Sequence, residues 1–125
     1  MTAGAVPERF NPAALDMLRR LGNGTLLVRM VELFLQTIPE RIASARAGLQ
    51  MNDVRAVEIA AHSIKSSAGQ LGGVGLQHTA ALLEHAASNG NVDTLAAGIE
   101  TIDTEFELMR VWLNQVTDGM GAAST

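Results

Sequence analysis

Residues 54–71 read VRAVEIAAHSIKSSAGQL and carry a run of apolar residues at alternating intervals of three and four positions. The members of this set are Val54, Val57, Ala61, Ile64, Ala68 and Leu71. Such spacing forms one apolar stripe along a helix and predicts that the stripe is buried against other helices. The segment begins at Asn52 or Asp53, which are good helix N-caps, and ends at Gly72-Gly73.

The same periodicity predicts further helices on both sides of this segment, over residues 11–22, 23–48, 74–89 and 93–116. Pro39 lies inside the helix expected over 23–48. Because proline lacks an N–H and clashes with the preceding turn, we expect a kink or a break there. Signals for strands are weak, since Tyr is absent and no segment alternates cleanly between apolar and polar residues.

The connections between the later helices are short, at residues 50–52, 72–73 and 90–92. Short connections make consecutive helices antiparallel neighbours. The sequence therefore predicts an all-α fold, an antiparallel up-down-up-down four-helix bundle whose one end is covered by the short first helix. We expect the bundle domain to span residues 11–117, with flexible tails at 1–10 and 118–125.

Composition excludes several classes of function. The chain has 125 residues, enough for one domain, and 9 basic against 13 acidic residues, with aromatics at 3%. It therefore lacks the basic surface and the stacking platform of a nucleic-acid binder. The absence of Cys excludes thiolate zinc sites and Cys nucleophiles. No apolar stretch is long enough for a membrane span and residues 1–10 do not form a signal peptide, so we expect a cytoplasmic protein.

A polar stripe interrupts the helix expected over residues 54–71. His62 is followed at i+3 by Lys65, on the same side of the helix. Small residues surround the pair: Ser63, Ser66, Ser67 and Gly69. A neutral imidazole is a competent nucleophile near pH 7 and can accept a phosphoryl group, whose charge a lysine would balance. Glu84 on the next helix is a candidate to orient the ring.

These residues also fit simpler interpretations. A helical His with a Lys at i+3 is most often a solvated surface. A metal site is a weak alternative, because the His residues (His62, His78 and His85) form no His-x-x-x-His pair, and His78 and His85 are expected at the surface. The glycines at 22–24 and 72–75 follow helices rather than strands, so there is no nucleotide-binding loop, and a phosphoryl group must come from another protein. Trp112 is expected to pack at the end of the bundle.

Residues 61–72, AHSIKSSAGQLG, resemble the signature of the histidine-containing phosphotransfer (HPt) domains. Leu83-Glu84 resembles a pair on the family's next helix, and Pro39 resembles a proline common in its long second helix. The resemblance covers about residues 11–117. It implies that His62 is phosphorylated on Nε2, that Lys65 stabilises the phosphohistidine, that Glu84 lies beside the ring, and that Ser67 is a small polar residue close to the site.

The resemblance further implies a phosphorelay carrier and not an enzyme in its own right. Its partners would be response-regulator receiver domains and a hybrid sensor histidine kinase, the receiver supplying Mg²⁺, and the chain would need no cofactor and act as a monomer. We expect the docking surface to include Ile59, Ser66 and Gly69, with Leu15 and Leu18 of the first helix over the nearby end. The alternatives are a bundle that binds these partners but has lost transfer activity, and a metal-dependent four-helix enzyme.

Overall fold

The computed structural model describes residues 8–124, with side chains through residue 119. Five α-helices follow one another: α1 (Pro12–Arg20), α2 (Thr25–Gln50), α3 (Val54–Gln70), α4 (Val74–Ser88) and α5 (Leu95–Ser124). A short 3₁₀ turn, η1 (Val92–Thr94), precedes α5. Within residues 8–124 there is no strand, and the predicted all-α fold is confirmed.

Two helices, α1 and α3, begin at capping residues that the sequence indicates. The Asn11 side chain accepts a hydrogen bond from the backbone N–H of Ala13 at 3.1 Å, with Pro12 at the first helical position. Asp53 does the same for Ala56 at 3.1 Å at the start of α3. Each cap satisfies a backbone donor that has no partner within its own helix.

Of the kink or break expected at Pro39, the break is absent, because α2 is one continuous helix from Thr25 to Gln50. Pro39 lies on the exposed side of α2, next to the fully buried Ile38. Proline has no N–H to donate to the carbonyl four residues earlier in the helix. On the exposed side of α2 that carbonyl is open to water, so the helix can continue through the proline.

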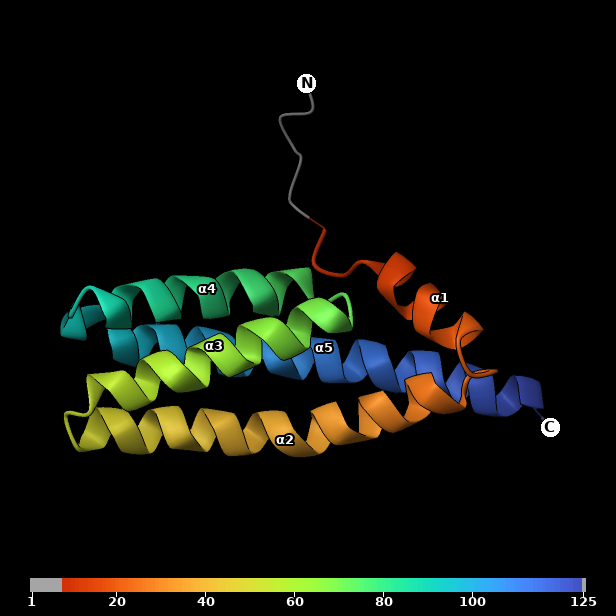
Figure 1. Ribbon diagram of the computed structural model, residues 1–125, viewed down its shortest axis with the longest axis horizontal. Coiled ribbons are helices and arrows are strands. Elements are labelled where there is room, and N and C mark those ends of the chain that lie inside the picture. The colour runs from red at the N-terminus through yellow and green to blue at the C-terminus, as the bar shows by residue number, and fades with distance from the viewer. Residues whose placement is uncertain (1–7, 125) are drawn as a thin grey trace, which may run out of the picture.

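The four long helices, α2 to α5, lie alongside one another, and the colour ramp in Figure 1 reverses direction from each to the next. Each helix contacts the next one, and α5 also contacts α2, which closes the bundle. The buried stripes of all four helices meet in one core, together with Leu15 of α1. The apolar residues that recur along each helix thus form the core of the bundle.

The expected tails differ from the structure at both ends. Residues 1–7 of the first tail lie outside the described residues. Arg9 and Phe10, also assigned to that tail, pack on the bundle: Arg9 pairs with Glu105, and the Phe10 ring stacks on Trp112 with centroids 4.5 Å apart. At the other end α5 continues to Ser124, so residues 118–124 are helical where a flexible tail is expected.

Candidate functional site

His62 lies at mid-length of α3 with its imidazole open to solvent. Its side chain is 62% exposed, although the preceding Ala61 is fully buried. The ring Nδ1 lies 2.7 Å from Oε2 of Glu84 on α4. Because α4 runs beside α3, Glu84 can hold the ring at Nδ1. The exposed side of the ring leaves Nε2 accessible.

The same glutamate also binds the lysine. Lys65 Nζ donates a hydrogen bond to Oε1 of Glu84 at 2.5 Å. The side chains of Lys65 and Glu84 are 33% and 21% exposed, so this pair is more sheltered than the ring of His62. The structure thus brings together all three residues, His62, Lys65 and Glu84, that sequence reasoning nominated for one site.

These contacts fix the charge of Glu84. The hydrogen bond from Lys65 lowers the pKa of the Glu84 carboxyl, burial opposes this effect, and the hydrogen bond from His62 lowers the pKa further. Glu84 is therefore a carboxylate at neutral pH. An ionised carboxylate only accepts hydrogen bonds, so the proton in the contact with His62 belongs to Nδ1.

The tautomer of His62 follows from this contact. With the proton on Nδ1, a neutral ring carries its lone pair on Nε2. Among the hydrogen bonds of the described residues, none involves Nε2 of His62. The site therefore presents a nucleophilic nitrogen to solvent on the side of the bundle. The Glu84 carboxylate binds the other ring nitrogen, and the Lys65 ammonium lies nearby.

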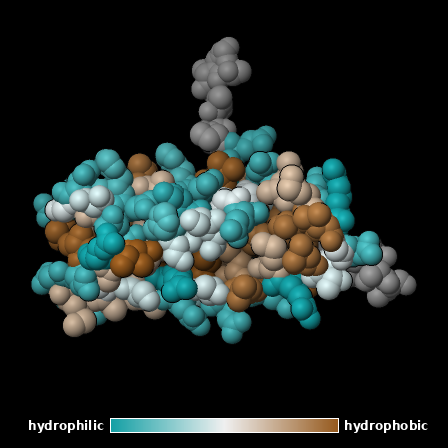
Figure 2. All heavy atoms as spheres, in the orientation of Figure 1, coloured by the Kyte–Doolittle hydropathy of each residue, from teal (hydrophilic) through white to brown (hydrophobic). Residues whose placement is uncertain are grey.

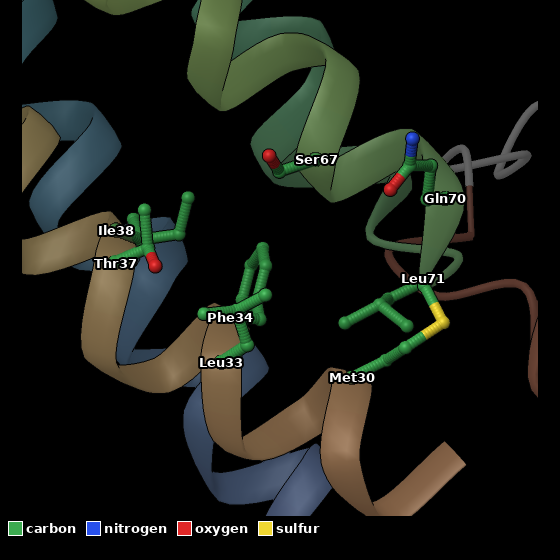
Figure 3. Close-up of a pocket in the computed structure, with 8 residues that line it drawn as sticks. All are labelled: Met30, Leu33, Phe34, Thr37, Ile38, Ser67, Gln70 and Leu71. Atoms are coloured by element: carbon green, nitrogen blue, oxygen red, sulfur yellow. The ribbon is translucent and has the colours of Figure 1, made fainter. Parts of the chain in front are cut away.

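Ser67 does not join this cluster. It is half-buried and lines a shallow groove of about 110 Å³ between α2 and α3. In Figure 3, Ser67 lies across the opening from Phe34 of α2, while Met30 and Leu71 meet at the other end of the groove. No hydrogen bond of the described residues connects Ser67 to His62, Lys65 or Glu84, so a direct part for Ser67 in the cluster is not supported.

The groove itself was not foreseen from the sequence. Its rim includes Leu33, which is 64% exposed although it precedes the buried Phe34. Figure 2 shows apolar side chains gathered where α1, α2 and the end of α3 meet. An off-stripe leucine in the middle of an amphipathic helix was the available signal, but a single exposed leucine is common on protein surfaces.

The expected docking residues have different environments. Ile59 is 56% exposed, and Ser66 is also exposed. Gly69 is half-buried beside α4, and a Cβ there would lie 2.6 Å from Nε2 of the Gln77 side chain. Leu15 is 1% exposed and belongs to the core, so its assignment to a docking surface is wrong, and Leu18 is partly buried against the same core.

The alternative sites are not supported by the described part of the chain. It contains no group of three or more His, Cys, Asp or Glu side chains arranged to hold a metal ion. His78 and His85 are exposed, as expected. None of the helices in the described residues has the length and apolarity needed to cross a membrane.

Comparisons with known proteins show the family of this chain. The family model of the Hpt domain matches residues 29–112. Histidine-containing phosphotransfer protein B (HptB) from Pseudomonas aeruginosa PAO1 is similar in structure, with a TM-score of 0.82 and 27% identity over 88% of this chain and 95% of that one. The histidine-containing phosphotransfer protein ZmHP2 from maize has a TM-score of 0.77 and 22% identity, over 100% of this chain and 91% of that one, and shares the fold. No curated protein matches the sequence significantly.

Proposed function

The chain belongs to the Hpt domain family and is a histidine phosphotransfer protein of a phosphorelay, and from this premise we propose that Nε2 of His62 carries the phosphoryl group. The observation that supports this assignment is the exposed ring, whose other nitrogen is bound by Glu84 at 2.7 Å. The two remaining histidines, His78 and His85, lack a carboxylate partner among the hydrogen bonds of the described residues.

The transfer step follows from this tautomer. The Nε2 lone pair attacks the phosphorus of a receiver's aspartyl phosphate, a P–N bond forms, and the P–O bond to the aspartate breaks. The aspartate leaves as a carboxylate, and Nδ1 keeps its proton throughout. The phosphorylated ring becomes cationic, and the Glu84 carboxylate stabilises that charge through the existing hydrogen bond. The reverse step passes the phosphoryl group to a second receiver.

We assign Lys65 to the phosphoryl oxygens. In the unphosphorylated protein its ammonium binds Glu84. A phosphoryl group on Nε2 would bring a charge of about −1.5 to −2 to the same flank. The ammonium is already positioned one turn from His62, so it can reach these oxygens by a rotation of its flexible side chain.

Hpt domains interact with receiver domains and histidine kinases of two-component systems. We propose that a receiver docks on Ile59, Ser66 and the neighbouring groove between α2 and α3. The receiver supplies the Mg²⁺ that the transfer requires, and this chain supplies the nucleophile and the surface around it. We further propose that the chain acts as a monomer in the cytoplasm and needs no nucleotide site of its own.

The test of this function is phosphoryl uptake from a phosphorylated receiver. Wild-type protein should acquire one acid-labile, base-stable phosphoryl group, and His62→Gln should acquire none. Because the His62 side chain is exposed, the circular dichroism and melting temperature of His62→Gln should stay close to those of the wild type. His85→Gln, another exposed histidine on the adjacent helix, is the matched control and should retain full uptake.

Equal labelling of wild type and His62→Gln would reject His62 as the acceptor. A wild-type protein that binds the receiver but takes up no label would instead indicate the alternative of an inactive binding module. That alternative is not favoured, since His62, Lys65 and Glu84 are all present and in contact.

A further inference from the structure

Residues 9–11, here called the N-terminal strap, are built into the bundle at the turn between α3 and α4. The backbone N–H of Asn11 donates to the carbonyl of Gly72 at 2.7 Å, and the N–H of Gly75 donates to the carbonyl of Arg9 at 2.9 Å. The strap therefore binds the backbone on both sides of the turn that joins the helix of His62 to the helix of Glu84.

A buried acid secures the strap from the other side. Arg9 Nε donates to both carboxylate oxygens of Glu105 on α5, each at 3.0 Å. The Glu105 side chain is only 11% exposed, and Glu105 is the one charged residue classed as buried within the described part of the chain. A buried carboxylate needs a charged or hydrogen-bonding partner. Release of Arg9 would leave the Glu105 carboxylate buried without one, and the free-energy cost of that state keeps Arg9 in place.

The glycines of the turn provide the space that the strap occupies. Gly72 has φ +77°, and a Cβ there would lie 2.2 Å from the carbonyl oxygen of Asn11. A Cβ on Gly75 would lie 2.8 Å from Oε1 of Glu105 and 2.9 Å from Cγ of Arg9. The strap therefore packs against the glycine-rich segment 72–75, and the glycines allow this close approach because they lack side chains.

The turn between α3 and α4 also has hydrogen bonds of its own, such as the one from the N–H of Gly73 to the carbonyl of Ala68 at 2.8 Å. A turn rich in glycine has many accessible conformations. The buried faces of the two helices combine large and small side chains: Val57, Ala61, Ile64 and Ala68 on α3, and Leu76, Ala80, Leu83 and Ala87 on α4. The alanines form shallower ridges than the larger side chains do. The strap adds two further directional bonds at the start of α4, from Asn11 to Gly72 and from Gly75 to Arg9.

We propose that Arg9, through the strap, is a positioning residue for the hydrogen bond between Glu84 and His62. Gly75 and Glu84 lie on the same helix, about 13 Å apart along its axis. Because a helix moves as a rigid rod over that distance, an axial shift of the first turn of α4 shifts Glu84 relative to His62 and Lys65. The contacts at 2.7 Å and 2.5 Å tolerate little displacement. This inference rests on the proposed function only for its effect on phosphoryl transfer.

Two substitutions in the full chain test the proposal by different routes. Arg9→Met removes the partner of Glu105. Gly75→Ala keeps every residue of the strap but displaces it, because it places a methyl group against Arg9 and Glu105, while an alanine in the first turn of α4 favours the helix. Arg110→Met is the control: it removes the same charge from an arginine that pairs with Glu107 at the exposed surface of α5.

Three measurements separate the effects. Emission from Trp112, the single tryptophan of the chain, reports release of the strap because Phe10 stacks on it. The ¹⁵N chemical shifts of the His62 ring report the share of the Nδ1–H tautomer, with His78 and His85 as internal references. The initial rate of phosphoryl uptake reports function.

We expect both test variants to change Trp112 emission, to shift His62 from the Nδ1–H toward the Nε2–H tautomer, and to slow uptake by about tenfold, the effect of one lost charged hydrogen bond. Arg110→Met should change none of these.

A released strap with an unchanged His62 tautomer would overturn the proposal and leave the strap a purely stabilising element. Unchanged Trp112 emission in both variants would also overturn it. A wild-type protein that takes up no phosphoryl group would reject the proposed function. In that case the tautomer of His62 in the two variants would still show whether the strap positions Glu84.

Discussion

Glu84 connects the other two residues of the site, because each of its carboxylate oxygens serves one of them. Oε2 accepts from His62 and Oε1 from Lys65. One residue therefore sets the tautomer of His62 and holds Lys65 beside it. A glutamine could still accept one of these hydrogen bonds but would bring no charge to balance the lysine or the phosphorylated ring.

Glu84→Gln should remove a pH-dependent part of the stability. The lysine contact, and after it the histidine contact, lower the pKa of Glu84 below its ordinary value of 4.5 in the folded protein. A carboxyl whose pKa is lower when folded stabilises the protein above its unfolded pKa, and this contribution is lost as pH falls through the folded pKa. The free energy of unfolding of the wild type should therefore exceed that of Glu84→Gln at about pH 5, and the difference should shrink toward about pH 3.

Urea unfolding of both proteins across this pH range measures the difference. Glu107→Gln is a useful control, because Arg110 likewise lowers the pKa of Glu107 but at a site remote from His62. It should show the same trend in stability but a weaker one, because Glu107 is 57% exposed and its ion pair is screened by solvent, with no effect on phosphoryl uptake. A difference between wild type and Glu84→Gln that stays constant or grows as the pH falls would contradict the assignment of Glu84 as the partner of Lys65.

At the scale of the element, α3 serves the core and the site with different sides. Val57, Ala61, Ile64 and Ala68 are buried, while Ile59, His62 and Ser66 are exposed. A helix repeats every 3.6 residues, so these two sets form separate stripes along its length. Substitution of an exposed residue can therefore change binding without disturbing the bundle.

Ile59→Asp should weaken receiver docking and leave the fold intact. Ile59 is 56% exposed and lies one turn before His62, so a charge there would face the partner across a desolvated contact. We expect about a tenfold or greater loss of receiver affinity, measured by calorimetric titration. Leu82→Asp is closely matched, since Leu82 is 58% exposed on α4, and should bind normally. Equal binding by both variants would remove Ile59 from the docking surface.

Pro39→Ala should stabilise α2. The helix is continuous through this exposed position, so alanine would restore a backbone hydrogen bond and remove the steric cost of the ring. We expect a gain of about 1–3 kcal/mol in the free energy of unfolding, which thermal denaturation would detect as a higher melting temperature. A lower melting temperature would mean that the proline is required for the shape of α2.

On the scale of the whole molecule, the bundle is a scaffold that holds two helices in fixed register. The site depends on α3 and α4, while α2 and α5 complete the core behind them (Figure 1). The core residues that lie away from the flank, such as Ile102 on α5, should therefore affect stability and not chemistry.

Ile102→Ala should lower the free energy of unfolding by about 2–5 kcal/mol, because Ile102 is 1% exposed and its truncation leaves a cavity in the core. Phosphoryl uptake measured well below the new melting temperature should stay within about twofold of the wild type. A large loss of uptake in a folded Ile102→Ala protein would show that the core and the site are coupled more strongly than the geometry implies.

The local sequence was sufficient for much of the architecture. Apolar spacing, capping residues and short connections predicted the helices and the bundle, because these signals act within a few residues of one another. The pairing of His62 and Lys65 on one side of α3 also followed from helical geometry alone. A break at Pro39 does not occur, and local sequence could not exclude it because it does not reveal that the residue lies on the solvent side of a long helix.

Contacts between distant segments were decided only by the tertiary structure. These include the sharing of Glu84 between two partners, the placement of Ser67 in a groove with α2, the burial of Leu15, and the pairing of Arg9 with Glu105 across 96 positions of sequence. Helical periodicity tells which side of a helix is buried, but the axial and rotational register of one helix against another depends on the packing of all of them together.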